Sequence, residues 1–176
     1  MPKPYQTDSL VLVDFANTSA ADWFVVNDGV MGGVSSSTME VVEGLGVFAG
    51  ILSLDNNGGF ASVRAVMESD LSGFGGLRLR VRGDGRTYQV RLRTNNRFDG
   101  VAYRAEFTTE TGEWITVTLP FDSFVPTFRG YTPRNVGPLD PGAIRQLGFL
   151  LGDKREGEFR LEVRSVVAVR GATLRQ

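Results

Sequence analysis

Every second residue is apolar in the stretch LRLRVR at residues 77–82, and the residues between them are arginines. After the turn GDGR at residues 83–86, the alternation returns in YQVRLR at residues 88–93. Side chains along a strand point alternately to opposite faces of a sheet, so this period of two predicts half-buried strands. Two such strands joined by a short turn predict a hairpin, with its apolar residues facing the core and its arginines facing away.

Short segments of the same kind fill the rest of the 176 residues. We expect strands at residues 10–15, 23–26, 35–43, 47–54, 61–66, 101–108, 114–119, 147–151 and 158–169. A helical turn capped by Asp122 is expected after residue 120, and residues 17–22 and 143–146 allow single helical turns. An apolar period of three to four residues nowhere persists long enough for a longer helix.

About eight to twelve short strands separated by turns predict an all-β protein, a β-sandwich of jelly-roll type with at most short helical turns. The length fits one domain, and we expect residues 1–176 to form a single sandwich with its core at about residues 10–170. The hydrophobic fraction of 41% is sufficient for one core.

The composition excludes several kinds of active site. The chain has no histidine and no cysteine, which rules out a Ser-His-Asp triad, a histidine base, a thiolate nucleophile and thiolate metal ligands. An enzyme would need a carboxylate pair, a lysine or a metal, and the carboxylates are scattered along the chain. We therefore expect no catalysis, no catalytic residues and no cofactor.

Charge and hydropathy also limit the partners. The formal net charge is −1, which does not favour nucleic acid. No apolar stretch approaches the roughly 18 residues of a transmembrane helix. The opening residues MPKPYQTD lack the pattern of a targeting segment, so a cytoplasmic location is expected.

Two glycine stretches run into predicted strands: VVNDGVMGGVS at residues 25–35 and LSLDNNGGFASVR at residues 52–64. Glycine permits positive φ and close approach of a backbone or ligand, and Asn and Asp tolerate left-handed geometry and bond nearby amides. They form either two ordinary turns or a shaped binding surface. We predict that an Asp28–Arg64 ion pair links the two stretches.

The glycine stretches also contain hard oxygen donors that could suit calcium, namely Asp28, Asp55, Asn56 and Asn57. No EF-hand spacing accompanies them, and side chains of this kind commonly cap turns. We therefore expect turn capping and no metal.

The two stretches together resemble the paired signature of the complex I intermediate-associated protein family. Trp114 and the blocks PFDSF (120–124), RG (129–130) and IRQLGF (144–149) are similar to that family's later motifs, so the likeness extends from about Leu10 to Val169. The resemblance implies a galactose-binding-domain-like jelly roll. In mitochondrial members it implies an assembly chaperone for respiratory complex I, and plant and algal relatives act in building photosynthetic complexes. Without an arginine- and serine-rich transit segment, this chain resembles a bacterial-type, single-domain member.

These observations lead us to expect a non-catalytic protein-binding module: an assembly factor for a respiratory (complex I-like) or photosynthetic complex, at the periphery of the membrane. Its partner would be a protein client, a subunit of that redox complex. The alternative is a module that binds a carbohydrate or another small molecule on its polar face. Exposed Tyr88, Tyr103 or Trp114 would favour sugar stacking, although we expect Trp23 and Trp114 to lie in the core.

The strand arginines allow two interpretations. They form either a solvated face with cross-strand Arg–Glu pairs or a shallow groove whose guanidinium groups bind carboxylates, sugar hydroxyls or an acidic partner. The candidate partner- or ligand-binding residues are Asp28, Met31, Gly32, Gly33, Ser35, Asn56, Asn57, Gly58, Gly59, Phe60, Arg64, Arg91 and Arg93.

Overall fold

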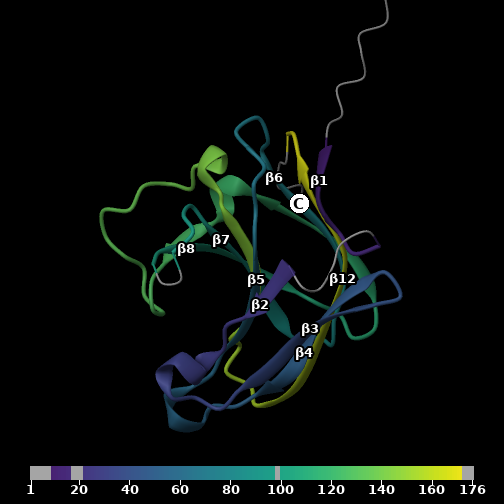
Figure 1. Ribbon diagram of the computed structural model, residues 1–176, viewed down its shortest axis with the longest axis vertical. Helices are drawn as coiled ribbons and strands as arrows, with labels where there is room; N and C mark the ends of the chain where they lie inside the picture. The colour runs from purple at the N-terminus through teal and green to yellow at the C-terminus, as the bar shows by residue number, and fades with distance from the viewer. Residues whose placement is uncertain (1–8, 17–21, 98–99, 172–176) are drawn as a thin grey trace, which may run out of the picture.

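The computed structural model describes residues 9–16, 22–97 and 100–171, which form two antiparallel sheets packed face to face (Figure 1). Sheet A has the order β3 (Ser36–Val42), β4 (Leu45–Leu52), β12 (Gly157–Val169), β6 (Gly76–Arg82) and β9 (Trp114–Pro120), and β1 (Ser9–Asp14) also pairs with β12. Sheet B has the order β10 (Val125–Thr127), β8 (Ala102–Thr108), β7 (Thr87–Arg93), β11 (Gln146–Leu151), β5 (Ala61–Val66) and β2 (Trp23–Val25).

The helices of the described residues are short 3-10 turns, as the sequence predicts. They are η2 (Asp28–Met31), η3 (Asp55–Asn57), η4 (Phe121–Ser123) and η5 (Pro141–Ala143). Asp122 lies inside η4 and makes no capping hydrogen bond, so its predicted capping role is wrong. The helical turn allowed at residues 17–22 falls mostly outside the described residues.

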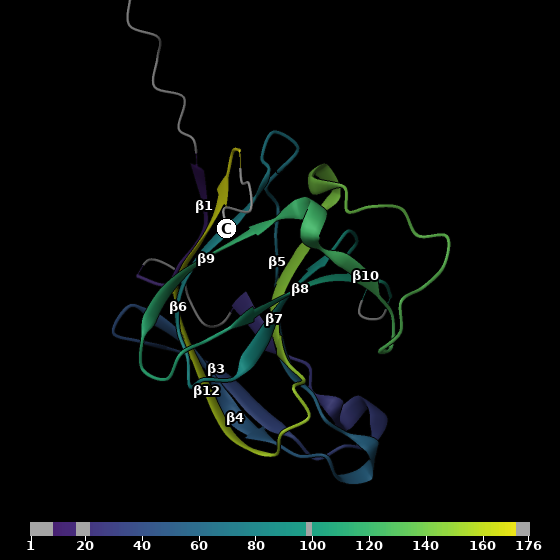
Figure 2. The same ribbon diagram turned by 180° about the vertical axis from the view of Figure 1, so that it is seen from behind.

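The predicted hairpin of residues 77–82 and 88–93 is wrong. β6 pairs with β12 and β9 in sheet A, whereas β7 pairs with β8 and β11 in sheet B. Residues 83–86 therefore carry the chain from one sheet to the other, and Figure 2 shows β6 and β7 in separate layers. Both strands still face the core with their apolar residues, because a sandwich buries the inner faces of both sheets.

The core lies between the two inner faces. Leu79 of β6 and Val90 of β7 are fully buried, and aromatic pairs such as Phe48–Phe159, with centroids 5.0 Å apart, fill the interior. Trp23 is buried against Phe149, as expected. Because β6 and β7 face the core from opposite sides, their arginines lie on the two opposite outer faces of the molecule rather than on one.

Trp114 differs from its predicted place in the core. It begins β9 opposite Arg82, is only partly buried, and lies on the outer face of sheet A. The guanidinium carbons of Arg82 and Arg164 each lie 4.9 Å from its ring centroid, and that of Arg80 lies 5.8 Å away. Cation–π contacts of this kind cover the indole without burying it in the core.

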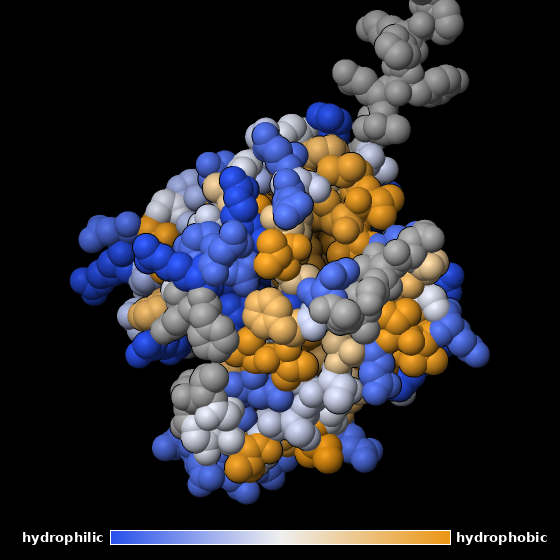
Figure 3. All heavy atoms as spheres, viewed as in Figure 1, coloured by the Kyte–Doolittle hydropathy of each residue, from blue (hydrophilic) through white to orange (hydrophobic). Residues whose placement is uncertain are grey.

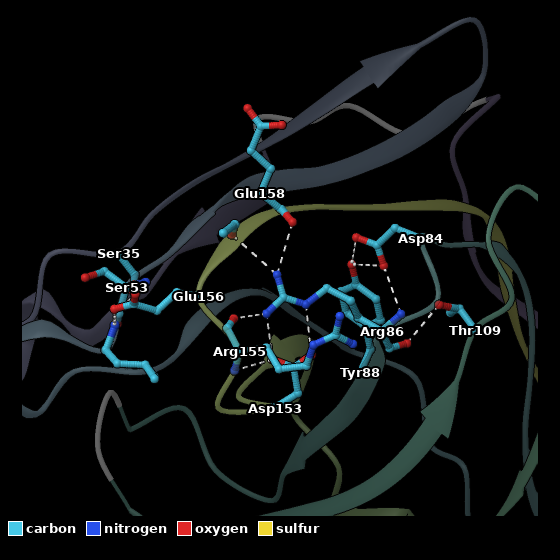
Figure 4. A network of polar contacts seen from close by, with 12 residues as sticks. Ser35, Ser53, Asp84, Arg86, Tyr88, Thr109, Asp153, Arg155, Glu156 and Glu158 are labelled. Carbon is cyan, nitrogen blue, oxygen red and sulfur yellow. Dashed lines mark hydrogen bonds and ion pairs between the residues drawn. The ribbon is translucent and has the colours of Figure 1, made fainter.

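A buried ion pair fixes the crossing between the sheets (Figure 4). The Arg86 side chain donates to both carboxylate oxygens of Asp153, at 2.8 and 2.7 Å, and also to the backbone carbonyls of Arg155 and Glu158. Burial raises the pKa of Asp153, but Arg86 lowers it by more, so the pKa lies below its ordinary value. The turn after β6 is thereby tied to the turn between β11 and β12.

Candidate functional site

The two glycine stretches meet at the Asp28 carboxylate, which solvent does not reach. Its Oδ1 accepts a hydrogen bond from the Ser35 amide at 2.9 Å. Its Oδ2 accepts from the Ser35 hydroxyl at 2.6 Å and from the Gly59 amide at 2.8 Å. One carboxylate therefore joins the loop before β3 to the loop before β5.

The surroundings of Asp28 explain why glycines flank it. A Cβ on Gly33 would lie 2.4 Å from the Asp28 Cγ, and one on Gly58 would lie 2.5 Å from its Oδ2. Burial raises the pKa of Asp28, but the hydrogen bonds from Ser35 and Gly59 lower it by more, so the pKa lies below its ordinary value. The carboxylate is accordingly a structural anchor whose two oxygens already have donors.

The other residues of the glycine stretches shape the same loops. Gly32, Asn56 and Asn57 have positive φ angles of 86°, 57° and 60°, and all three are exposed. The half-buried Phe60 accepts a hydrogen bond from the Asp28 amide at 3.1 Å through its backbone carbonyl. The structure describes the backbone of Met31, which belongs to η2, but not its side chain.

The predicted Asp28–Arg64 ion pair is wrong. The donors to Asp28 come from its own loop and from Gly59, whereas Arg64 lies on β5, four residues beyond Phe60 and thus about 13 Å further along the strand. The Arg64 guanidinium carbon lies 5.6 Å from the centroid of the Phe24 ring on the neighbouring strand. The candidate residues therefore divide into a loop cluster around Asp28 and a group on the outer face of sheet B.

We call this second group the arginine face: Arg64, Arg91, Arg93 and Arg104. The registers place Arg64 of β5, Gly148 of β11, Arg91 of β7 and Arg104 of β8 in one row across the sheet. Arg93 follows two residues after Arg91 and shares its face. Figure 3 shows hydrophilic side chains gathered over β7 and β8.

Arg91 lies at the centre of this row. Its Nε donates to the amide oxygen of Gln89 at 2.8 Å. Burial, and then the like charges of Arg93, Arg104 and Arg64, lower the pKa of Arg91 to about 10. The guanidinium is therefore positive at neutral pH in surroundings that disfavour its charge.

Gly148 leaves a recess beside Arg91. The recess has a volume of about 30 Å³ and is lined by Ser62, Arg64, Arg91, Arg93, Gln146, Gly148 and their neighbours. The Gln146 side-chain amide donates to the carbonyls of Asn95 and Arg97, at 2.9 and 3.1 Å, and so holds the loop after β7 near this recess. A volume of this size accepts one or two water-sized groups.

Arg104, Gln146 and Gly148 were not among the site residues predicted from the sequence. The alternation at residues 101–108 places Arg104 on a polar face, and Gly148 lies in the block at residues 144–149. Neither signal reveals that β11 lies between β5 and β7, which is what brings these residues to Arg91.

Sheet A carries a second surface. A wide, open groove of about 670 Å³ lies over β3, β4 and β12 and includes Thr38, Ile51 and Arg160 in its lining. Elsewhere on the same sheet, Arg82 and Arg160 both pair with the Glu162 carboxylate, at 2.5 and 3.0 Å. Two arginines of sheet A therefore share one counter-charge, in agreement with the interpretation as a solvated face with cross-strand pairs.

Aromatic side chains suited to sugar stacking are scarce on these faces. Tyr88 is fully buried, and Tyr103 is buried with its hydroxyl donating to the Gly137 carbonyl at 2.9 Å. Trp114 is partly exposed but lies beneath three guanidinium groups. In the part of the chain that the structure describes, no group of three or more carboxylates could hold a metal ion, and no helix is long and apolar enough to cross a membrane.

Comparison with protein families finds one match that covers most of the chain. Residues 13–163 match the family described as Complex I intermediate-associated protein 30 (CIA30). Complex I intermediate-associated protein 30 of Drosophila melanogaster is 28% identical over 186 residues, which cover 92% of this chain. The mouse protein of the same name is 38% identical over 98 residues, or 53% of this chain. The matched regions span 62% and 30% of the two relatives' own lengths.

Solved structures with the same fold include carbohydrate-binding modules. The Family 11 Carbohydrate-Binding Module from Clostridium thermocellum, in complex with a beta-1,3-1,4-mixed-linked tetrasaccharide, superposes with a TM-score of 0.71 at 17% identity, covering 94% of this chain and 98% of that one. A carbohydrate-binding module of family 29 has a TM-score of 0.57 at 14% identity, covering 93% of this chain and 92% of that one. These matches confirm the predicted galactose-binding-like jelly-roll sandwich.

Proposed function

This chain belongs to the Complex I intermediate-associated protein 30 family, and on that basis we propose that it is a non-catalytic protein-binding module that acts as an assembly factor. Its client would be a subunit of a membrane-associated redox complex, either a respiratory complex of the complex I kind or a photosynthetic one. The family match over residues 13–163 carries the proposal, because it includes both glycine stretches, all of sheet B, and sheet A except most of β1 and the last residues of β12.

We further propose that the described sheets act as one domain, located in the cytoplasm at the periphery of the membrane complex. The loop cluster supplies a rigid support, since Asp28 fixes both glycine stretches from within. Exposed Gly32, Asn56 and Asn57 on that cluster, together with the arginine face, would form the contact surface. A preorganised surface of this kind reduces the entropy cost of binding a client.

A module that binds a carbohydrate or another small molecule is the second candidate. The fold shared with the Family 11 Carbohydrate-Binding Module favours it. The burial of Tyr88 and Tyr103 and the guanidinium groups over Trp114 weaken it, because sugar rings stack on open aromatic faces.

Affinity purification from the native host tests the assembly role. The tagged protein is recovered after mild detergent lysis, and the bound proteins are identified by mass spectrometry against a tag-only control. We expect enrichment of subunits of one respiratory or photosynthetic complex. If no such subunit is enriched above the control, the assembly role is wrong and a glycan screen becomes the next experiment.

A further inference from the structure

The arginine face combines charge from three strands of sheet B. Arg64, Arg91 and Arg104 come from β5, β7 and β8, and the side-chain-free Gly148 separates Arg64 from Arg91 in the row. Alanine cannot replace that glycine without movement, because its Cβ would lie 2.6 Å from the Val63 carbonyl oxygen. The close approach of the strands and the recess thus depend on the same position.

Among the described residues, little negative charge balances Arg91 and Arg104 in this arrangement. Because Arg64 and Arg93 make further contacts, the positive charge available to a ligand is counted from Arg91 and Arg104 alone. The partner of Arg91 is the neutral amide of Gln89, and no described carboxylate forms an ion pair with it. Arg104 pairs with Glu106 at 3.2 Å, but both side chains are more than one third exposed, and such pairs are weak.

The ends of the same row are apolar. Phe24 of β2 lies opposite Arg64, and Val125 of β10 lies opposite Arg104, with exposed fractions of 40% and 42%. Cross-strand partners point to the same face of a sheet. The row therefore runs from an apolar side chain, across three guanidinium groups, to a second apolar side chain.

We propose that the arginine face binds carboxylate groups of an acidic segment in a protein partner, one whose carboxylates are flanked by apolar residues. This deepens the proposed function and rests on it for the partner's being a protein. Arginine forks bind carboxylates in a bidentate manner, and a recess with room for one or two water-sized groups admits a carboxylate at the end of a flexible side chain. A pyranose ring is too bulky to enter it.

The apolar ends favour a peptide over nucleic acid or an anionic membrane. Both of those ligands are polyanionic surfaces that call for a large excess of positive charge, whereas this chain has a net charge of −1. The carboxylates of an acidic segment would meet the arginines at the centre of the row, and its apolar residues would meet Phe24 and Val125 at the two ends. A bound carboxylate would also relieve the like-charge repulsion around Arg91.

Binding of a synthetic peptide tests the proposal. The probe is a fluorescein-labelled peptide of alternating Leu and Glu-Glu units, and its control has Gln at every Glu position. Fluorescence anisotropy should give saturable binding of the Glu peptide that weakens as salt is added, and about tenfold or more weaker binding of the Gln peptide. Equal binding of the two peptides, or no binding of either, would overturn the proposal.

Matched variants locate the site. Arg91→Gln and Arg104→Gln should each weaken peptide binding about tenfold or more, whereas Arg78→Gln, an equally neutralising change at an exposed position of sheet A, should not. If Arg91→Gln does not fold, two other measurements test the assigned site. One is peptide binding by Arg104→Gln, and the other is the shift of the Arg91 Nε–Hε NMR signal when the peptide is added to the wild type. Equal weakening by Arg78→Gln would show general charge attraction and overturn the assigned site. Tighter binding of DNA or anionic vesicles than of the Glu peptide would assign the face to a different class of partner.

The same variants separate this proposal from the assembly role. Recovery of redox-complex subunits that is lost in Arg91→Gln and Arg104→Gln but kept in Arg78→Gln would support both. Subunit recovery unchanged by all three substitutions, without peptide binding, would leave the assembly role standing and overturn the carboxylate site. Specific peptide binding without any redox-complex subunit would support the site and overturn the assembly role.

Discussion

Asp28 holds the two glycine stretches together with a carboxylate that solvent does not reach. Its donors are the amide and hydroxyl of Ser35 and the amide of Gly59, and each is worth more to a charged acceptor than to a neutral one. Glycine at positions 33 and 58 leaves the space that the carboxylate occupies. The polar and glycine residues of these stretches are thus explained first by loop structure, and the residues left for binding a partner are exposed ones such as Gly32, Asn56 and Asn57.

Asp28→Asn should lower the free energy of unfolding by about 2–4 kcal/mol at neutral pH, because the amide loses the charge and turns an NH₂ group toward a donor. The folded pKa of Asp28 lies below its ordinary value of 3.8, so the carboxylate stabilises the fold above that value and loses this effect as the pH falls through the folded pKa. Urea denaturation at several pH values should show the gap between wild type and variant closing in acid. Asp55→Asn, an exposed change in the second stretch, is the control and should leave stability nearly unchanged. A gap that is constant down to about pH 2 would contradict the assigned charge.

We expect the charged Arg91 side chain to lower the free energy of unfolding. Its pKa of about 10 lies below the ordinary value of an arginine, so the charged form destabilises the fold below about pH 10, and the penalty fades as the pH rises further. Arg91→Met keeps much of the side-chain volume and should raise the free energy of unfolding by about 1–3 kcal/mol at neutral pH and low salt. Chemical denaturation of the two proteins measures the gain, which should shrink above about pH 10. A loss of stability at neutral pH would mean that the guanidinium is needed for packing.

At the scale of the elements, turns decide how the strands combine. Alternation is a local property, so it predicts β5 at residues 61–66 and brings most other strands within two residues of their observed ends. Pairing is not local. β6 and β7 follow each other after a short turn, yet the two strands join different sheets. The Arg86 side chain extends from that turn and binds Asp153, which lies 67 residues further along the chain. The sequence identifies both turns as charged but cannot show that they meet.

Arg86→Ala should therefore lower the free energy of unfolding by about 3–5 kcal/mol, because it leaves the partly buried Asp153 without its partner. The double variant Arg86→Ala/Asp153→Ala should lose less than the sum of the two single variants, since the second change removes the orphaned charge. Arg155→Ala, at an exposed position of the same turn, is the control. Thermal unfolding measures wild type, the two single variants, the double variant and the control, and strictly additive losses would show that the pair is not coupled.

For the whole molecule, the two outer faces differ although both are rich in arginine. Sheet A supplies Glu162 to Arg82 and Arg160 and covers Trp114 with three guanidinium groups. Sheet B places Arg91 among like charges with a neutral partner. The sequence predicts that Arg64, Arg91 and Arg93 are polar-face residues, but the difference between the faces follows from strand order, which alternation does not encode. The predicted core position of Trp114 fails for the same reason, because hydrophobicity alone does not assign the face of an edge strand.

We expect the difference between the two outer faces to determine which ligands this protein binds. A beta-1,3-1,4-mixed-linked tetrasaccharide, the ligand of the Clostridium thermocellum module, should give no saturable heat in titration calorimetry with this protein. Sugar binding needs an open aromatic face. On the two sheets, Tyr88 and Tyr103 are buried, Trp114 lies beneath three guanidinium groups, and the exposed Phe24 ring has the Arg64 guanidinium carbon 5.6 Å from its centroid. The acidic peptide titrated under the same conditions is the positive control for an active surface. Saturable tetrasaccharide binding that Arg91→Gln abolishes would instead assign the arginine face to sugar hydroxyls, and the carbohydrate-binding alternative would then replace the assembly role.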